Sequence, residues 1–516
     1  MNRFFFTATA VGSMALLASC SQEEVSTVKQ NKEGLPISFR AGVSTRVNPT
    51  LDYTSNPATF YVTAYPDTHK ATNGQIPDSL FWDEPFYLMG ANLYASTSNK
   101  KWPSQEQAKQ VEFFAYAPSL EEIQAAAFTQ LDPTDPNYQN YLNNYKGGIQ
   151  FFNLCQPGTH LDPLNQENTT FNGVQLYTGF KLGRFYVATD ISKQVDFITS
   201  HIAADTPASE DDAELGVELK FHHQLSNVEL RAFSGNKDFN IEIAGVRLGR
   251  PFTGSAIFNF CDADGNVSNP DGGQWGIARD PQRLPVEYIY GEGDEIYRMG
   301  SFNNLVGGQV ITTPAHTSAA TATTIMGKGG NAMVLPTKNG PWAGEENPWI
   351  APKYSAFTGN AGTDPYPDQN PKPWSADNVE EGDMYFSVLI RVTTKPEGSE
   401  VSTPQIYPYG NNTTMNVVYL EKEKNSNKIV GRVPSKTSAV GANNEIVEFG
   451  WAAVPVGVNW ERGKKYIYTL DFSNGVGVQD PEDPKPGTPI IGSGITFSVS
   501  VVGWDEQTIG TNVPQE

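Results

Sequence analysis

The sequence predicts an all-β protein built from two tandem domains. Its 47 glycines and 36 prolines supply many turns, and tyrosine and phenylalanine are frequent. Long stretches with the apolar period of a helix are almost absent, whereas short segments that alternate apolar and polar residues recur. Sheets with one buried and one solvated face are typical of β-sandwiches. We therefore expect two β-sandwich domains with long loop insertions and one or two short helices.

The chain begins with the layout of a secretory signal peptide, expected over residues 1–19. A positive charge at Arg3 precedes an apolar run that ends in the small residues Ala18 and Ser19, directly before Cys20. The run is too short and wrongly flanked for a stable membrane span. It resembles the bacterial lipoprotein signal, in which cleavage between Ser19 and Cys20 is followed by acylation of the cysteine. The alternative is an ordinary secreted protein with a chance cysteine.

Acyl chains on Cys20 would hold the protein on a membrane, since each buried methylene contributes about 0.8 kcal/mol. Residues 20–34 are polar, and we expect a lipidated, flexible tether there. The acidic "SQEE" after the cysteine resembles the tag that directs lipoproteins of Bacteroides-type bacteria to the outer face of the cell. The prediction is a surface-exposed lipoprotein of the cell outer membrane.

Charge and cysteine content restrict the possible binding partners, disulfides and metal sites. With 36 basic and 57 acidic residues, the net charge of −21 argues against nucleic acid or anionic lipid as a partner. Besides Cys20, only Cys155 and Cys261 remain, and their apolar surroundings favour two separate buried thiols over one bridge. Nothing resembles a zinc framework. We expect no metal and no cofactor.

The first domain is expected over residues 35–210. Its first strand places Ile37 and Phe39 on one face. A capping box of Ser119 and Glu122 predicts a short helix, and Asp135 before a proline predicts a second one. Strands are expected at 35–43, 59–65, 111–118, 173–177 and 183–190.

An acidic stretch at 204–214, which lacks large apolar residues, is interpreted as the domain boundary. The second domain is therefore expected over residues 211–516. The stretch 262–380 is rich in Gly, Pro, Asn and Thr and is predicted to contain extended loops. Strands are expected at 215–221, 239–248, 255–260, 383–392, 415–420, 444–454, 465–472 and 494–504.

Several fragments together resemble the fimbrillin family, the type V pilus subunits of Bacteroides-type bacteria. Besides the lipoprotein start, they are "ISFRAGVSTR", "WPSQEQAKQVEFFAYAP", "VELKFHHQLSNVELRAF", "NAMVLPT", "WERGKKYIYTLDF" and "ITFSVSVVGW", in the family's order from about residue 35 to 504. Residues 262–380 and parts of 393–445 have no recognised counterpart. The resemblance implies two transthyretin-like Greek-key β-sandwich domains.

The resemblance also implies an assembly mechanism. In the family, an arginine-specific protease removes the first strand with its lipid, and an extended segment of another subunit fills the apolar groove that is left. Arg46 stands where the family carries its Thr-Arg site, so cutting there would remove Ile37 and Phe39. Arg46 as a solvated loop residue is an equally good interpretation. Arg40 is an alternative cleavage site, although it lies within the strand.

If this subunit donates a strand to the groove of another subunit, its last strand is the natural candidate. The favoured alternative is that this is an ordinary strand of the second domain. The stretch "DPEDPKPGTP" before it would then be only a stiff connection. Burying four apolar side chains in a groove would contribute on the order of 6–12 kcal/mol to the free energy of binding, before the entropy cost of ordering the strand is subtracted. The residues expected to share the apolar face are Ile495, Phe497, Val499 and Val501.

The sequence contains no complete motif for catalysis or metal binding. The calcium-loop-like "DADGN" at 262–266 lacks the required glycine and glutamate, and "GVNWERGKK" lacks the spacing of a phosphate loop. His222 and His223 point to opposite faces of a strand and cannot jointly bind one metal. We expect no catalytic residues and no enzymatic activity.

Aromatic residues in Pro/Gly loops could stack on sugar rings or anchor a protein partner, although small cores that pin the loops are the favoured interpretation. These candidate binding residues are Trp342, Trp349, Tyr366 and Trp374.

The function expected from the sequence is that of a fimbrillin-like surface lipoprotein. It would be a tip or accessory pilus subunit that binds other subunits by strand exchange and acts in adhesion to a host protein or glycan. The alternative is a surface glycan-binding lipoprotein of a nutrient-uptake system. A surface hydrolase is a third hypothesis, which would need two close acidic residues in a cleft.

Overall fold

The computed structural model describes a little over half of the chain. The described residues are 34–43, 57–67, 80–90, 92–119, 151–152, 181–185, 187–249, 251, 256–260, 274–277, 284–300, 303–306, 309–312, 316–327, 330–336, 384–394, 405–410, 415–455, 460–492 and 494–503. The two helices expected after Ser119 and Asp135 and the strand expected at 173–177 lie outside these ranges. The prediction of an all-β chain is confirmed, since strands dominate the described residues.

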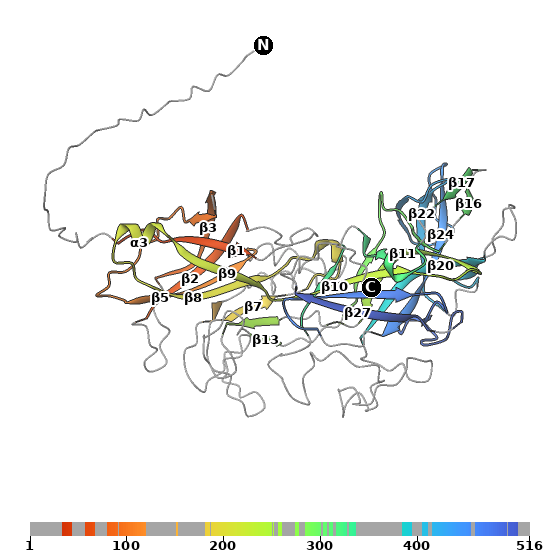
Figure 1. Cartoon of the computed structure of the whole chain (residues 1–516). Coiled ribbons are helices and arrows are strands. Elements are labelled where there is room, and N and C mark those ends of the chain that lie inside the picture. The colour runs from red at the N-terminus through yellow and green to blue at the C-terminus, as the bar shows by residue number, and fades with distance from the viewer. Residues whose placement is uncertain are drawn as a thin grey trace, which may run out of the picture.

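The first half is a closed sheet of seven strands, at the left of Figure 1. Its order is β1-β4-β3-β2-β5-β8-β9, and it closes because β1 pairs antiparallel with β4 and parallel with β9. Alternate side chains point inward and form a core of their own, as the period of two requires. The strands are β1 (Ser38–Val43), β2 (Thr59–Pro66), β3 (Phe81–Gly90), β4 (Leu93–Ala95), β5 (Gln110–Ala117), β8 (Ile198–Asp205) and β9 (Val217–His223).

The stretch interpreted as a domain boundary is part of this first half. It contains α3 (Glu210–Glu214), whose first turn is capped by the Ser209 side chain, which accepts a hydrogen bond from the Asp212 amide. β9 follows and pairs with β1 and β8, so the first sheet extends beyond the expected boundary at residue 211. Composition missed this because acidic residues favour the first turn of a helix as well as a linker.

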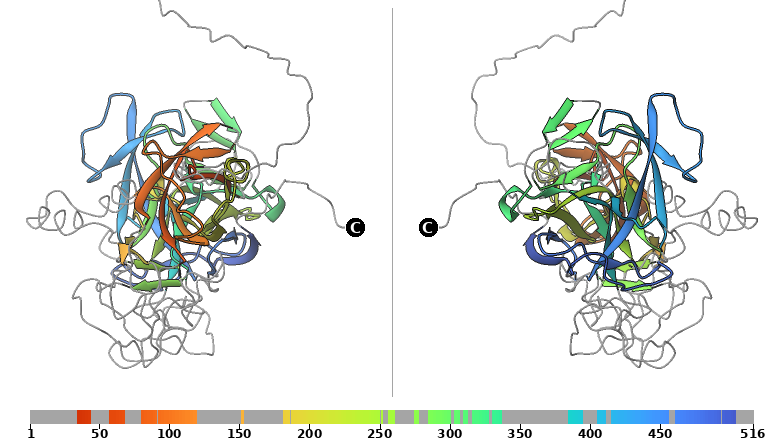
Figure 2. Two further views of the ribbon diagram at one scale, coloured as in Figure 1. Left: turned by 90° about the vertical axis from the view of Figure 1, so that its left-hand side faces the viewer. Right: turned by 90° about the vertical axis from the view of Figure 1, so that its right-hand side faces the viewer.

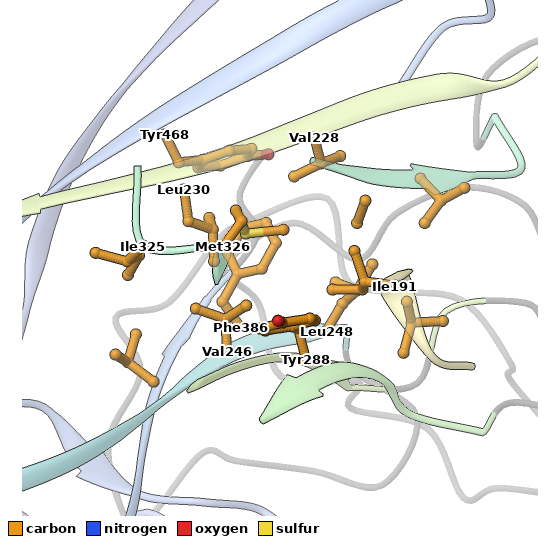
Figure 3. Packing of buried hydrophobic residues seen from close by; sticks show 14 of the residues in the cluster. Ile191, Val228, Leu230, Val246, Leu248, Tyr288, Ile325, Met326, Phe386 and Tyr468 are labelled. Atoms are coloured by element: carbon orange, nitrogen blue, oxygen red, sulfur yellow. The ribbon is translucent and has the colours of Figure 1, made fainter. Parts of the chain in front are cut away.

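The second half consists of two sheets packed face to face. One has the order β18-β10-β25-β27, and the other has the order β14-β11-β20-β24-β22-β23. Val228, Leu230 and Tyr468 of the first sheet face Val246 and Phe386 of the second across the core (Figure 3).

The strands of the first of these sheets are β10 (Ser226–Phe233), β18 (Thr323–Thr324), β19 (Ala332–Val334), β25 (Lys464–Asp471) and β27 (Thr496–Gly503). β19 lies off the main strand order and pairs with β10. Those of the second are β11 (Phe239–Gly249), β14 (Val286–Ile289), β15 (Tyr297–Met299), β20 (Tyr385–Thr394), β21 (Gln405–Tyr407), β22 (Val417–Glu423), β23 (Ile429–Val433), β24 (Asn444–Pro455) and β26 (Val478–Gln479).

Smaller elements complete the described structure. A four-stranded sheet contains β13 (Gln274–Ile277), β12 (Ala256–Asn259), β7 (Lys181–Phe185) and β6 (Phe151–Phe152), and a hairpin contains β16 (Asn303–Val306) and β17 (Gln309–Thr312). Two short 3-10 helices, η1 (Ile191–Lys193) and η2 (Ala319–Thr321), lie in connections. Among the described residues, no helix has the length and apolar content that crossing a bilayer requires.

The two halves lie end to end and share apolar contacts. The end-on views show the first-half strands at one end of the molecule and the strands of the last part of the chain at the other (Figure 2). Tyr65, Phe114 and Tyr116 come from the first half but belong to the large core cluster of the second half. The ring of Phe114 lies 5.3 Å from that of Phe260 in an edge arrangement. Strands β2 and β5 therefore contribute one face to each core.

Candidate strand-exchange site

β1 is hydrogen-bonded on both edges. Phe39 lies opposite Tyr94 of β4 and opposite Val217 of β9. The pairing extends before the strand, because the Ile37 amide donates to the Lys100 carbonyl at 2.8 Å and the Leu35 carbonyl accepts from the Trp102 amide at 2.8 Å. β1 is therefore the strand that closes the barrel, and it follows directly on the N-terminal segment.

Burial along β1 alternates strictly. Leu35, Ile37, Phe39 and Ala41 are buried, whereas Arg40 is exposed. Ile37 and Phe39, the two residues placed on the inner face by the sequence pattern, are 3% and 0% exposed. The strand fills the barrel with one row of side chains and presents the other row to solvent.

Phe39 lies at the centre of an aromatic cluster. Its ring is 4.7 Å from that of Phe86, 5.1 Å from that of Phe113 and 5.8 Å from that of Phe60, all in edge arrangements. Each such pair contributes about 0.5–1.5 kcal/mol beyond the burial of area. Without β1, this cluster would line an apolar groove between the backbone edges of β4 and β9.

Polar groups fix the walls of the groove. The buried Tyr94 hydroxyl donates to the Pro57 carbonyl at 2.7 Å, and burial raises the pKa of Tyr94 to about 12. Burial opposes ionisation of Glu84, but hydrogen bonds from Ser96, Ser98 and Lys100 outweigh it and lower the Glu84 pKa. Lys100 lies 3.2 Å from the Glu84 carboxylate. Tyr94 and Glu84 thus have hydrogen-bond partners outside β1, whose Ser38 hydroxyl donates instead to the Ala213 carbonyl of α3 at 3.5 Å.

One glycine sets how closely α3 and β9 approach β1. Gly216, between the two elements, has a φ of +70°, which favours glycine. A Cβ there would also lie 3.2 Å from the Ser38 hydroxyl of β1. The turn into β9 therefore passes directly against the first strand.

β27, the donor candidate, is the last strand of its sheet. It pairs antiparallel with β25 from Thr496 to Gly503, and no described strand pairs with its other side. Ile495 is buried, Phe497 and Val499 are half-buried, and Val501 is 53% exposed. The apolar face predicted from the sequence therefore exists as a row, but burial fades along it.

The segment before β27 is attached to the second half rather than acting only as a stiff connection. The Val476 amide donates to the Ile491 carbonyl at 3.1 Å, and the Ile490 amide donates to the Gly477 carbonyl at 3.0 Å. Gly492 then takes a φ of +68°, and a Cβ there would lie 2.5 Å from the Asn474 carbonyl oxygen. The chain is held up to Gly492, and β27 begins four residues later, at Thr496.

A buried ion pair reinforces that attachment. Asp480 is fully buried, and its carboxylate lies 2.7 Å from Arg247 Nη2 and accepts hydrogen bonds from Tyr385 and Ser387. The Arg247 guanidinium lies 4.3 Å from the centre of the Trp451 ring. The proline-rich segment that begins at Asp480 is thereby fixed to strands β11, β20 and β24.

Asp483 lies close to this ion pair. Burial, together with the charge of Asp480, raises the pKa of Asp483 to about 7, although Arg247 and the Asn416 amide favour its ionised form. The Asn416 amide donates to the Asp483 carboxyl at 2.8 Å. This acidic side chain therefore changes charge near neutral pH.

The histidines near the junction of the two halves are structural. His223 Nδ1 lies 2.7 Å from the Asp196 carboxylate, and both side chains are fully buried. Its neighbour His222 is partly exposed, as expected for adjacent residues of a strand. His201 stacks on Phe114 at 4.6 Å, and burial lowers its pKa to about 4. Within the described ranges, no group of His, Cys, Asp and Glu is arranged to hold a metal.

Several candidate residues of the sequence lie outside the described residues. They are Ser19 and Cys20 of the signal, the cleavage-site candidate Arg46, the loop aromatics Trp342, Trp349, Tyr366 and Trp374, and the thiols Cys155 and Cys261. The lipidation, maturation and ligand-binding roles expected of them remain predictions.

One exposed apolar patch was missed by sequence reasoning. Tyr87, Leu88 and Met89, at the end of β3, are 39%, 43% and 69% exposed. They directly precede the turn to β4, and the carbonyl of Asn92 in that turn accepts a hydrogen bond from the Ala41 amide of β1 at 3.4 Å. The sequence does indicate this patch, because Tyr87, Leu88 and Met89 are three consecutive apolar residues before a turn, without the polar residues that would alternate with them in a half-buried strand.

Comparison with known proteins returned solved structures but no matching family model and no matching curated protein. The chain is similar to a fimbrial protein from Bacteroides vulgatus, with 13% identity over 90% of this chain and 99% of that chain and a TM-score of 0.45. It is similar to a putative cell adhesion protein from Parabacteroides distasonis, with 11% identity over 91% and 98% and a TM-score of 0.35. A tip fimbrial protein from Porphyromonas gingivalis matches with 10% identity over 91% and 99% and a TM-score of 0.26. Because these TM-scores lie below 0.5, functional assignment depends on the residues of this chain.

Proposed function

We propose that this protein is a fimbrillin-like subunit of a cell-surface pilus, joined to its neighbour by strand exchange after removal of the first strand, and that it acts in adhesion. The observation that carries the proposal is the position of β1. It is a single strand next to the N-terminal segment, and it closes a barrel whose aromatic core surrounds Phe39.

After β1 is removed, a groove filled by another strand is lower in free energy than an empty groove. Its removal would expose the backbone edges of β4 and β9, and such edges are templates for a strand from another chain. It would also expose the pockets of Leu35, Ile37 and Phe39, whose burial contributes about 1.5–3 kcal/mol for each side chain. A strand of the same pattern recovers both contributions at once.

The remaining steps come from the sequence. A lipid on Cys20 would hold the precursor at the outer membrane, and cleavage after Arg46 would release β1 together with the lipid anchor. The size of the chain and the loop insertions expected from its sequence favour a tip or accessory position, because a shaft would carry that bulk at every copy. Part of residues 262–380 does not add to this bulk, since β14, β15, β18 and β19 belong to the two packed sheets.

Proteolysis of the purified precursor tests the proposal. An arginine-specific protease is expected to produce a new N-terminus at Val47, followed by high-mass species in size-exclusion chromatography. An Arg46→Lys precursor keeps the charge but not the cleavage site, and it should stay monomeric under the same treatment. The proposal fails if Arg46 resists cutting and no polymer forms, or if the Arg46→Lys precursor polymerises equally well.

A further inference from the structure

A cavity of about 430 Å³ lies in the second half, between three segments of the chain. Tyr290 and residues 293–298 line one side, residues of the segment 316–327 line another, and Asn427, in the turn between β22 and β23, completes the wall. Such a volume is typical of small-molecule sites, which are concave and carry a few fixed polar groups. The described residues that line this cavity are distinct from those of the β1 groove.

Backbone hydrogen bonds join two of the walls. The Gly293 amide donates to the Ile429 carbonyl at 2.9 Å, and the Ile429 amide donates to the Asp294 carbonyl at 2.7 Å. The Ile296 amide donates to the Asn427 carbonyl at 2.9 Å, so the turn after β14 and the turn after β22 form one ridge. Walls that are fixed in this way are preorganised, and binding a ligand there costs little ordering entropy.

The Asn427 side chain carries an unpaired hydrogen-bond acceptor. Its Oδ1 atom is shielded from solvent and has no hydrogen-bond partner within the part of the chain that the structure describes. Buried polar atoms of folded proteins are almost always paired, because an unpaired one loses its hydration without compensation. An unpaired oxygen on a residue that lines a cavity is therefore placed to accept a hydrogen bond from a ligand.

Two aromatic rings form another part of the wall. The ring centres of Tyr297 and His316 lie 4.8 Å apart, and their planes are inclined by 34°. His316 Nδ1 lies 2.7 Å from the Thr321 carbonyl oxygen, which can only accept, so Nδ1 carries the proton. In the neutral ring, Nε2 is then a second acceptor of the cavity. The His316 carbonyl accepts from the Ser234 amide at 2.9 Å, which fixes the backbone that carries this ring.

The charges around the cavity favour a neutral ligand over an acidic one. Arg298 is 5% exposed, and its Nη2 lies 2.8 Å from Glu242 Oε1, so its charge is compensated within the protein. Glu295 is exposed and lines the cavity. Asp294 adds a second carboxylate, which accepts from the hydroxyl of Tyr288, a residue of the core (Figure 3), at 2.8 Å. A ligand with its own carboxylate would be repelled by these two side chains.

We propose that this cavity binds a neutral sugar residue of a glycan, with the sugar ring against Tyr297 and His316. Its hydroxyl groups donate to Asn427 Oδ1, His316 Nε2 and Glu295. The inference rests on the proposed function, since it names the ligand class and the site of the adhesive role. Sugars carry several hydroxyl donors and an apolar face of C–H groups, which match the acceptors and the aromatic wall. A lysine side chain of a protein partner would pair with Glu295 but would leave most of the cavity unfilled.

Titration of the full-length, uncleaved chain with defined sugars tests the inference. Isothermal titration calorimetry with lactose, maltose, mannobiose and N,N′-diacetylchitobiose covers neutral hexoses and N-acetylhexosamines. At least one of them should bind with a Kd of about 1 mM or tighter, and its derivative with an added sialic or glucuronic acid should bind about ten-fold more weakly. The inference is overturned if none of the neutral sugars binds, or if a lysine-rich peptide binds in their place.

Side-chain variants locate the site. Asn427→Ala should weaken sugar binding about ten-fold without lowering the melting temperature, because Oδ1 has no partner in the described chain. His316→Phe keeps a ring beside Tyr297 but removes Nε2, and it should also weaken binding about ten-fold. Glu295→Ala should weaken binding, whereas Glu292→Ala, an exposed change in the same turn that faces a different cavity, should not. Equal losses for the two glutamate variants, or a lower melting temperature for Asn427→Ala, would contradict the assignment.

Two immobilised glycans distinguish the source of the sugar. Retention on mucin indicates a glycoprotein and retention on yeast mannan indicates a polysaccharide, and the free sugar that binds in solution should compete in either case. Retention that this sugar does not compete would overturn the inference. The uncleaved chain separates sugar binding from assembly. A chain that polymerises after cleavage but binds no neutral sugar rejects this inference alone, whereas one that binds the sugar but never polymerises rejects the strand exchange of the proposed function.

Discussion

β1 and β27 have matching patterns of apolar and polar residues but very different surroundings. β1 lies between two strands, and its inner residues Ile37 and Phe39 are almost completely buried. β27 lies beside one described strand, and along its apolar row exposure rises to 53% at Val501. The difference teaches that alternation predicts which residues share a face, whereas the neighbouring strands decide how deeply that face is buried.

The largest expected effect is a core truncation in β1. Phe39→Ala should lower the free energy of unfolding by about 3–5 kcal/mol, because it leaves a cavity in a closed aromatic cluster. Phe497→Ala in the uncleaved chain should cost clearly less, since Phe497 is only half-buried there. Urea denaturation of both variants measures the contrast, and equal losses would contradict the distinction between the two strands.

A slightly smaller effect is expected where β27 is attached. Asp480→Ala leaves the Arg247 guanidinium without its buried partner, and breaking such a pair costs about 3 kcal/mol or more. Hydrogen exchange should then show faster opening of residues 476–503, with β1 unchanged. Protection that falls equally in both regions would show that the ion pair stabilises the whole molecule rather than the C-terminal segment.

The acidic residue beside that ion pair should make stability depend on pH. The pKa of Asp483 is about 7 in the folded chain, above the ordinary value of 3.8, so the folded state binds this proton more tightly. Its contribution to stability is fully present below about pH 4 and is lost as the pH rises to about 7. Each pKa unit of difference is worth about 1.4 kcal/mol.

Asp483→Asn removes this titration, although Asp480, Arg247 and the Asn416 amide still face the site. The variant should gain stability relative to the natural chain between pH 4 and pH 8, measured as the melting temperature across that interval. A parallel pH dependence in both proteins would show that other groups dominate.

The smallest expected effect is at the exposed end of β27. Val501→Ser should change the free energy of unfolding of the uncleaved chain by no more than about 0.5 kcal/mol, because Val501 is 53% exposed. Calorimetry measures this value. A loss above 1 kcal/mol would mean that the end of β27 already has a packing partner in its own chain.

Much of the local structure could be predicted from the sequence, because a period of two is a property of neighbouring residues. The inner face of β1 and the positions of β5, β20 and β25 follow from it directly. The candidate site could be predicted only in part. Ile37 and Phe39 were identified, but the exposed Leu88 and Met89 were not, since exposure depends on which strands cover them.

The sequence by itself determined the all-β class and the rows of apolar residues in β1 and β27, since turn residues and alternation act over a few neighbouring positions. Only the tertiary structure decided that β9 closes the first barrel, that Asp480 meets Arg247, and that β27 lies beside a single described strand. These facts depend on contacts between residues far apart in the chain, such as positions 39 and 217, or 247 and 480. Such contacts form where whole sheets find surfaces to bury, and no short stretch of sequence contains that information.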